Sequence, residues 1–92
     1  MDNYNLKSKN NVIVNINTVE KVKAFANKML KIDCECDLVS ESRRYVIDAK
    51  SIMGIFSLDI SKNLILHIHA DENDPVINKV CDAIKDYIVV TK

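Results

Sequence analysis

The stretch LILHIHADENDP, residues 64–75, predicts two successive elements of the fold. Apolar residues occupy every second position from 64 to 70, and this period of two is typical of a half-buried β-strand. After the strand, Asp74 is a good helix-capping residue and Pro75 suits the first position of a helix. We therefore expect a strand over residues 64–70 and a last helix from Pro75 to about Val89.

The same alternation predicts three further strands upstream. NVIVNIN at residues 11–17 and CECDLV at residues 34–39 each place apolar side chains on one face. The polar turn SESRR separates the second of these from a short strand over residues 45–47. The simplest pairing of these last two strands is a hairpin.

A helix is expected between the first two strands, ending at about Lys31. Asn17 or Thr18 can cap it, and Glu20 can return a bond to Asn17 in a capping-box-like arrangement. The apolar residues of this helix recur at three- and four-residue spacing, which predicts one buried face. That face comprises Val19, Val22, Phe25, Ala26, Met29 and Leu30.

A short helix over residues 52–56 is predicted after Ser51, and it completes the order β-α-β-β-α-β-α. Half-buried strands and amphipathic helices satisfy each other only if the helices cover one face of a sheet, which leaves the other face in water. The predicted fold class is α+β, an open-faced β-sandwich with a four-stranded antiparallel sheet. Residues 1–10 lack an apolar period and are predicted to be a flexible tail ahead of one domain over residues 11–92.

The composition excludes several classes of protein. A chain of 92 residues is too short for a two-domain enzyme, and a formal net charge of zero argues against a nucleic-acid-binding module. One glycine cannot build a Gly-rich phosphate loop, and no apolar run approaches the roughly 20 residues of a membrane-spanning helix. The polar N-terminus and the odd number of cysteines favour a cytoplasmic protein. We expect no nucleic-acid partner, no membrane association and no cofactor.

The segment AKSIMGIFSL, residues 49–58, carries a resemblance to a known family. Together with the order of elements, it resembles the histidine-containing phosphocarrier (HPr) family of the bacterial sugar phosphotransferase system (PTS) over about residues 11–90. Its KSIMG portion, residues 50–54, matches the family's regulatory-serine motif residue for residue. The resemblance implies an HPr-like fold and a PTS protein that is not an enzyme.

The resemblance also locates the family's phosphoryl acceptor, a histidine just before the first long helix in a pattern like GLHARPA. Counting back from the end of the helix places Thr18 at the histidine position, Glu20 at the arginine position and Lys21 at the proline position. A threonine phosphoester lacks the labile P–N bond of phosphohistidine, and Glu20 would repel a phosphate that arginine attracts. We therefore predict that phosphorelay through this helix is lost and that no catalytic residue remains.

The serine of KSIMG is phosphorylated by a dedicated kinase in the family, so the resemblance implies a regulatory phosphorylation site at Ser51. The residues after it belong to the family's docking surface, which implies partner contacts by Ile52, Met53 and Phe56. Implied partners are PTS proteins or a transcription regulator, together with a serine kinase. The alternative is that Ser51 only caps the short helix while Ile52 and Met53 fill the core.

Lysines give the first helix a positive outer face, including Lys21, Lys23 and Lys28. Most such stripes are merely solvated. In the HPr family this neighbourhood docks acidic partner surfaces, so the resemblance implies that these lysines bind a partner.

Two histidines, His67 and His69, are predicted to point to one face of the strand over residues 64–70, opposite its apolar residues. Paired histidines on a strand can bind a metal, with Glu35 or Asp37 on a neighbouring strand as a third ligand. The spacing alone is unspecific, so we favour solvated histidines and predict no metal site.

The cysteines give no clear functional motif. Cys34 and Cys36 share the face of Leu38, which favours burial in the core over a redox or zinc pair. Cys81 lies on the last predicted helix and adds no second pair.

The sequence thus favours a binding or regulatory PTS protein that has lost the transferable histidine and acts through protein contacts. A working phosphocarrier with an unusual acceptor, His67 or His69, is the first alternative. A structural role without any connection to sugar transport is the second.

Overall fold

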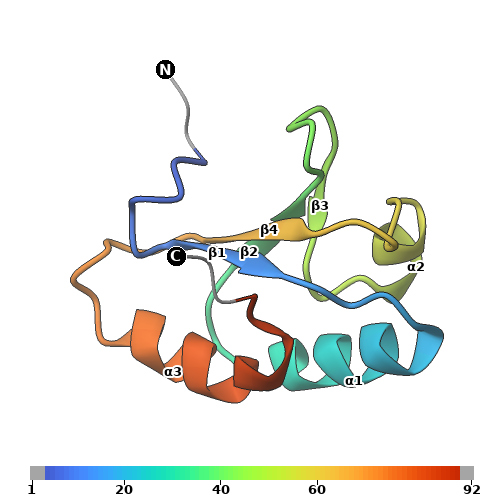
Figure 1. Cartoon of the computed structure of the whole chain (residues 1–92). Coiled ribbons are helices and arrows are strands. Elements are labelled where there is room, and N and C mark those ends of the chain that lie inside the picture. The colour runs from blue at the N-terminus through green and yellow to red at the C-terminus, as the bar shows by residue number, and fades with distance from the viewer. Residues whose placement is uncertain (1–3, 90–92) are drawn as a thin grey trace.

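Four antiparallel strands form one sheet in the structure, a computed structural model that describes residues 4–89 (Figure 1). The strand order is β1-β4-β2-β3, so β4 lies between β1 and β2. The strands are β1 (Asn11–Val14), β2 (Cys36–Val39), β3 (Val46–Asp48) and β4 (Leu64–Ile68). β2 and β3 form the predicted hairpin.

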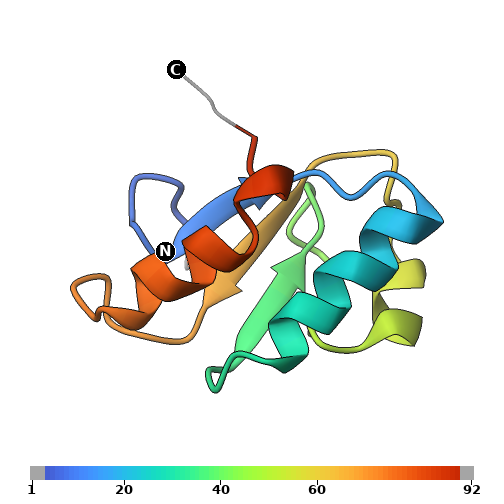
Figure 2. The ribbon, with the colours of Figure 1, turned by 90° about the horizontal axis from the view of Figure 1, so that it is seen from below.

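The helices are α1 (Val19–Leu30), α2 (Ile52–Phe56) and α3 (Val76–Ala83), followed by η1, a single 3₁₀ turn (Lys85–Tyr87). α1 and α3 lie side by side under the sheet, and α2 packs against α1 and β3 (Figures 1 and 2). The predicted α+β open-faced β-sandwich, with its β-α-β-β-α-β-α order, is confirmed.

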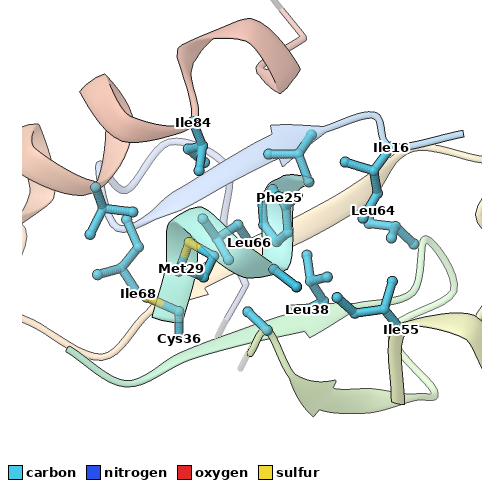
Figure 3. Packing of buried hydrophobic residues seen from close by; sticks show 14 of the residues in the cluster. Ile16, Phe25, Met29, Cys36, Leu38, Ile55, Leu64, Leu66, Ile68 and Ile84 are labelled. Carbon is cyan, nitrogen blue, oxygen red and sulfur yellow. The ribbon is translucent and has the colours of Figure 1, made fainter. Parts of the chain in front are cut away.

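The core lies between the sheet and the helices (Figure 3). α1 contributes Phe25 and Met29, which are fully buried, and α2 contributes Ile55. The covered face of the sheet supplies alternate residues of its two central strands, as the period of two predicts. These residues are Cys36, Leu38, Leu64, Leu66 and Ile68.

The predicted buried face of α1 is wrong at its two ends. Val22, Phe25, Ala26 and Met29 are buried, whereas Val19 is 52% exposed and Leu30 is 59% exposed. Both exposed residues lie at the edge of the apolar stripe, where side chains point away from the sheet toward solvent.

Thr18 is the residue that caps α1. Its backbone is extended and its Oγ1 accepts a hydrogen bond from the amide of Lys21 at 3.1 Å. The capping box predicted between Asn17 and Glu20 therefore does not form, because it requires Asn17 to be the cap.

The last helix is shorter than predicted, because α3 stops at Ala83 rather than near Val89. The Asn15 amide donates to the Tyr87 carbonyl at 2.8 Å, and the Val89 amide donates to the Ile13 carbonyl at 2.9 Å. These bonds satisfy the edge of β1 that β4 leaves free. Pairing with β1 has replaced the last turns of the predicted helix.

The face of the sheet away from the helices is not uniformly exposed, contrary to the expectation that it stays in water. Ile65 is 5% exposed and Val39 is fully buried, although neither belongs to the core beneath the helices. Leu6 of the N-terminal segment and Arg43 of the β2–β3 loop line a hollow together with Ile65. Short loops, rather than helices, shield this part of the sheet.

The N-terminal segment makes defined contacts from Tyr4 onward. The Asn10 side chain donates to the Ala70 carbonyl at 3.2 Å, and the Lys9 amide donates to the Glu72 carboxylate at 3.3 Å. Flexibility of residues 1–10 stays a prediction, and residues 1–3 lie outside the described part of the chain. Within residues 4–89, no helix has the length and apolar character needed to cross a membrane.

Candidate functional site

The N-terminus of α1 presents a small hydroxyl and a carboxylate to solvent. Thr18 and Glu20 are both exposed. The Thr18 hydroxyl oxygen already accepts the Lys21 amide hydrogen, which satisfies one of the free donors of the first turn. Glu20 in that turn suits the positive end of the helix, but its charge opposes the approach of a phosphate.

The three lysines named from the sequence differ in their surroundings. Lys21 and Lys23 are exposed, and the Lys21 ammonium donates to the Asn17 side chain at 3.3 Å. Lys28 is half-buried, 4.0 Å from the Asp86 carboxylate, and its ammonium lies 5.4 Å from the centre of the Tyr87 ring. Lys28 therefore already contacts the C-terminal segment.

Ser51 caps α2 in the same way that Thr18 caps α1. Its Oγ accepts a hydrogen bond from the Gly54 amide at 3.1 Å. A Cβ on Gly54 would lie only 3.1 Å from Ser51 Oγ and 3.5 Å from the Ile47 side chain. The glycine thus permits a close approach between α2, its cap and β3.

The residues that follow Ser51 present apolar surface to solvent. Met53 is 83% exposed and Phe56 is 38% exposed, whereas Ile52 is half-buried against the core. The alternative that Ile52 and Met53 fill the core is therefore wrong for Met53, whereas it fits Ile52. In both ribbon views α2 lies beside the first turns of α1 (Figures 1 and 2).

Lys50 has a structural role that its position in the motif did not reveal. Its ammonium donates to the Ile32 carbonyl at 2.7 Å, just beyond the end of α1. This bond links the segment before α2 to the far end of α1. No pattern in the sequence pairs these two residues, because the contact depends on the tertiary fold.

Comparison with known families identifies the chain. The family model described as the PTS HPr component phosphorylation site matches residues 19–89. The chain belongs to the HPr family. It is therefore a phosphocarrier-type protein of the PTS, a class that consists of carrier proteins rather than enzymes. No curated protein and no solved structure matches significantly.

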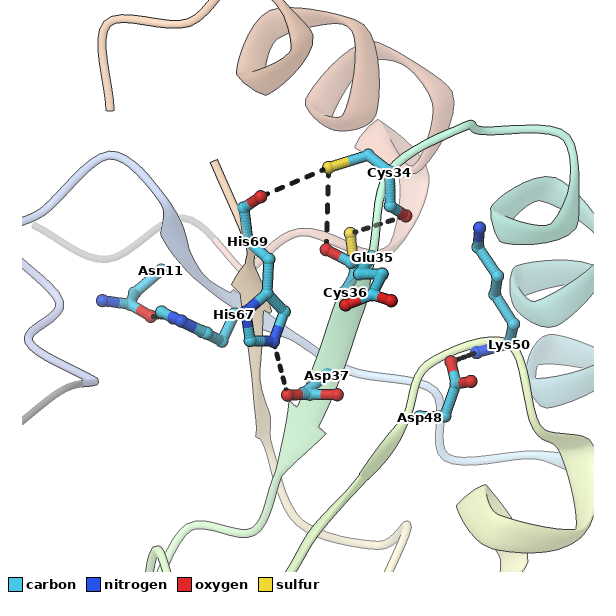
Figure 4. A network of polar contacts seen from close by, with 9 residues as sticks. All are labelled: Asn11, Cys34, Glu35, Cys36, Asp37, Asp48, Lys50, His67 and His69. Carbon is cyan, nitrogen blue, oxygen red and sulfur yellow. Dashed lines mark hydrogen bonds and ion pairs between the residues drawn. The ribbon is translucent and has the colours of Figure 1, made fainter. Parts of the chain in front are cut away.

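The two histidines of this HPr protein lie on the open face of the sheet, as predicted (Figure 4). His67 is flanked by Asn11 of β1 and Asp37 of β2 in the strand register. His67 Nδ1 lies 2.6 Å from Asn11 Oδ1, and His69 Nε2 lies 2.6 Å from Asp37 Oδ2. Burial lowers the pKa of His67, and the neighbouring His69 lowers it further.

The cysteines of the HPr domain face the core side. Cys36 is buried, and burial raises its pKa from 9.0 to about 12. Cys34 is half-buried against the core, and burial raises the pKa of Cys81. Within residues 4–89, no group of three or more His, Cys, Asp or Glu side chains is arranged to hold a metal.

Proposed function

We propose that this chain is an HPr protein that acts by binding and regulation in the cytoplasm rather than by phosphoryl transfer. The observation that supports this most is the N-terminus of α1, where Thr18 is an exposed cap and Glu20 stands in the first turn. The histidine and arginine of the family's acceptor site occupy neither position. The family match begins at residue 19, just after Thr18.

The chemistry of the α1 terminus supports the loss of phosphorelay. Phosphohistidine transfers its group through a labile P–N bond, which a threonine ester cannot provide. The carboxylate of Glu20 would also add a like charge beside any phosphate at this cap. Both histidines of the chain, His67 and His69, belong to the opposite side of the sheet.

A docking surface on α2 and α1 is the second part of the proposal. Met53 and Phe56 supply exposed apolar area of the kind that anchors protein interfaces. Lys21 and Lys23 supply exposed positive charge on α1, and Lys28 supplies charge that now contacts Asp86. Ile52 supports the base of this surface. The partner is a PTS protein or a transcription regulator with an apolar patch and acidic rim.

Ser51 is proposed as the regulated residue of this surface. A phosphate on its Oγ would replace a neutral cap with two negative charges, one residue before Ile52 and two before Met53. Such a change favours partners with basic side chains and disfavours acidic ones. The alternative, a cap without regulation, is equally compatible with the Gly54 hydrogen bond.

Phosphoenolpyruvate and the general PTS enzymes test the loss of phosphorelay. We expect the wild-type chain to acquire no acid-labile, hydroxylamine-sensitive phosphate. The matched control is Thr18→His combined with Glu20→Arg, which restores both side chains of the family's acceptor and should become labelled. Labelling of the wild type that disappears in His67→Gln or His69→Gln would overturn the proposal in favour of the unusual-acceptor alternative.

The docking surface is tested by exchanging one exposed methionine. Met53→Ser should weaken capture of PTS proteins or a transcription regulator, because it removes an exposed apolar anchor without touching the core. Leu30→Ser is the matched control, since Leu30 is also exposed but lies at the other end of α1. Equal capture by both variants would place the interface elsewhere, and capture of neither class of partner by the wild type would favour a structural role.

The serine kinase of the PTS network tests Ser51 directly. We expect wild type and Ser57→Ala to be labelled equally and Ser51→Ala to stay unlabelled. Ser57 is a suitable control because it stands at the other end of the same short helix. If the kinase labels the wild type no more than Ser51→Ala, the regulatory role of Ser51 is wrong. Ser51 is then only the cap of α2.

A further inference from the structure

Two imidazoles lie next to each other on the open face of the sheet, outside the surfaces that the proposed function uses. The ring centres of His67 and His69 are 4.8 Å apart, and the planes of the rings are 82° from each other. Imidazole planes bound to one ion can turn about the metal–nitrogen bond, so perpendicular rings are compatible with a shared ion. Metal–nitrogen distances of about 2.0–2.1 Å require imidazoles to be this close.

Each imidazole is held by an oxygen on a neighbouring strand. Asn11 Oδ1 lies 2.6 Å from His67 Nδ1, and Asp37 Oδ2 lies 2.6 Å from His69 Nε2. Histidines that bind metals almost always donate their second ring nitrogen to such an oxygen, which orients the ring and directs the lone pair of the other nitrogen outward. His67 Nε2 and His69 Nδ1 are the two nitrogens left, and neither makes a hydrogen bond to the described residues.

The charges around the histidines favour a cation. Asp37 is the cross-strand neighbour of both His67 and Asp48, so two carboxylates continue the row on β2 and β3. Glu35 stands opposite His69, whose amide donates to the Glu35 carbonyl at 2.9 Å. The Asp37 carboxylate beside His69 repels a phosphate or other anion here, whereas it attracts a divalent cation.

We infer that His67 and His69 form an open, two-imidazole site for a divalent transition ion of the zinc, nickel and copper type, with Asp37 and Asn11 as positioning residues. Imidazole suits these ions and does not suit magnesium or calcium, which prefer oxygen ligands. Water completes the coordination, because the described residues offer no third side chain in place. The site is independent of the proposed docking surface, which lies on the helix side.

This site departs from the sequence-based expectation, which considers a metal at this histidine pair and favours solvated histidines because the spacing is unspecific. From the sequence, Asp37 is only one possible third ligand, and Asn11 is not singled out. The strand register adds that information, since it places both oxygen donors on the two neighbours of β4.

Calorimetric titration of the full, untagged chain with ZnCl₂, NiCl₂ and MgCl₂ tests the inference. We expect one Zn²⁺ or Ni²⁺ per chain and no response to Mg²⁺. His69→Gln removes one of the two imidazoles at an exposed position and should abolish the binding heat of Zn²⁺ and Ni²⁺, as should His67→Gln. Since the chain holds only two histidines, the double variant retains no imidazole.

Asp37 provides the test of positioning. Asp37→Ala should weaken Zn²⁺ affinity about tenfold, and Asp37→Asn should restore much of it, because the amide oxygen can still accept from His69 Nε2. Circular dichroism of each variant confirms that it folds. Equal affinities of Asp37→Ala and wild type would remove Asp37 from the site.

Three outcomes would overturn the inferred site. They are a wild-type chain that binds neither Zn²⁺ nor Ni²⁺, a double His67→Gln/His69→Gln variant that binds like wild type, and a Cys34→Ser variant that loses binding while the histidines are intact. The last would assign the metal to the thiol, whose Sγ lies 3.9 Å from the His69 carbonyl.

Discussion

The two faces of the sheet differ in what covers them and in the ionisable groups they hold. The covered face packs against α1 and α3, and its one ionisable side chain within β2 and β4 is the thiol of Cys36. The open face carries both histidines and Asp37. Both imidazoles therefore lie across the sheet from α1, whose N-terminus is capped by Thr18.

The open face is itself divided into two rows by the strand register. One row is apolar and the other is polar, and each crosses all four strands. The apolar row is Ile13, Ile65, Val39 and Val46, and the polar row is Asn11, His67, Asp37 and Asp48. In the first row Ile65 and Val39 are buried, whereas Val46 at the edge is exposed. In the second row Asn11 bonds His67, and Asp37 bonds His69 just beyond β4. The chemistry available to a histidine on this face therefore depends on the side chains that the strand register places next to it.

The largest predicted difference between the faces is in stability. Leu66 and His67 are adjacent in β4 but point to opposite faces. Leu66→Ala should lower the free energy of unfolding by about 2–5 kcal/mol, because a fully buried side chain leaves a cavity in the core. His67→Gln should lower it by less than about 1 kcal/mol, since a polar side chain is kept.

Urea unfolding at pH 7 measures both values. Ile65→Ala is an informative third variant, because Ile65 is nearly buried although no helix covers it. A loss for Ile65→Ala as large as that for Leu66→Ala would show that the loops shield the open face as effectively as the helices cover the other.

The second prediction concerns alkaline pH and the covered face. Burial raises the pKa of Cys36 from 9.0 to about 12, so above pH 9 the unfolded chain loses the thiol proton while the folded chain keeps it. The stability contributed by Cys36 is full below pH 9 and is lost as pH rises from there toward 12, at about 1.4 kcal/mol per pH unit at most.

Stability curves of wild type and Cys36→Val between pH 8 and pH 10 check this expectation. In Cys36→Val the free energy of unfolding should fall less steeply with rising pH, because the contribution of this thiol is absent. Parallel curves would mean that the folded chain releases the Cys36 proton as readily as the unfolded one does.

The third prediction concerns the cap of α1, on the helix side of the sheet. Thr18→Ala should lower the free energy of unfolding by about 1 kcal/mol, because the Lys21 amide loses its acceptor. Thr18→Ser keeps the hydroxyl and should stay close to wild type. Thermal unfolding of the two variants is the measurement. A Thr18→Ala loss matched by Thr18→Ser would point to packing of the threonine methyl group rather than to capping.

Much of the fold follows from local patterns. Alternation in residues 64–70 and 11–17 predicts strands that the structure contains, and Pro75 stands just before α3 as expected. Local patterns cannot show which strands become neighbours. For that reason they missed the pairing of Val89 with β1 and the exposure of Leu30 at the end of α1.

In the candidate site, too, local contacts can be predicted from the sequence, whereas tertiary contacts cannot. The capping role of Ser51 is readable from the chain, because a cap is a local hydrogen bond to Gly54. The Lys50 bond to Ile32 and the Asn11 bond to His67 join residues far apart in sequence. Such contacts depend on the register of the sheet and on the placement of α2. No periodic pattern in the sequence predicts either of them.

The smallest predicted effect lies at acid pH on the open face. Burial and then His69 lower the pKa of His67 below 6.5, whereas Asp37 raises it in part. The stability contributed by the neutral imidazole is therefore present above pH 6.5 and is lost as pH falls, because the unfolded chain takes up the proton first.

His67→Gln should flatten the acid limb of the stability curve between pH 7 and pH 5. His69→Gln should flatten it only in part, since it removes one of the two causes and leaves the burial of His67 in place. Equal acid limbs in all three proteins would mean that the His67 ring is as open to water in the folded chain as in the unfolded chain.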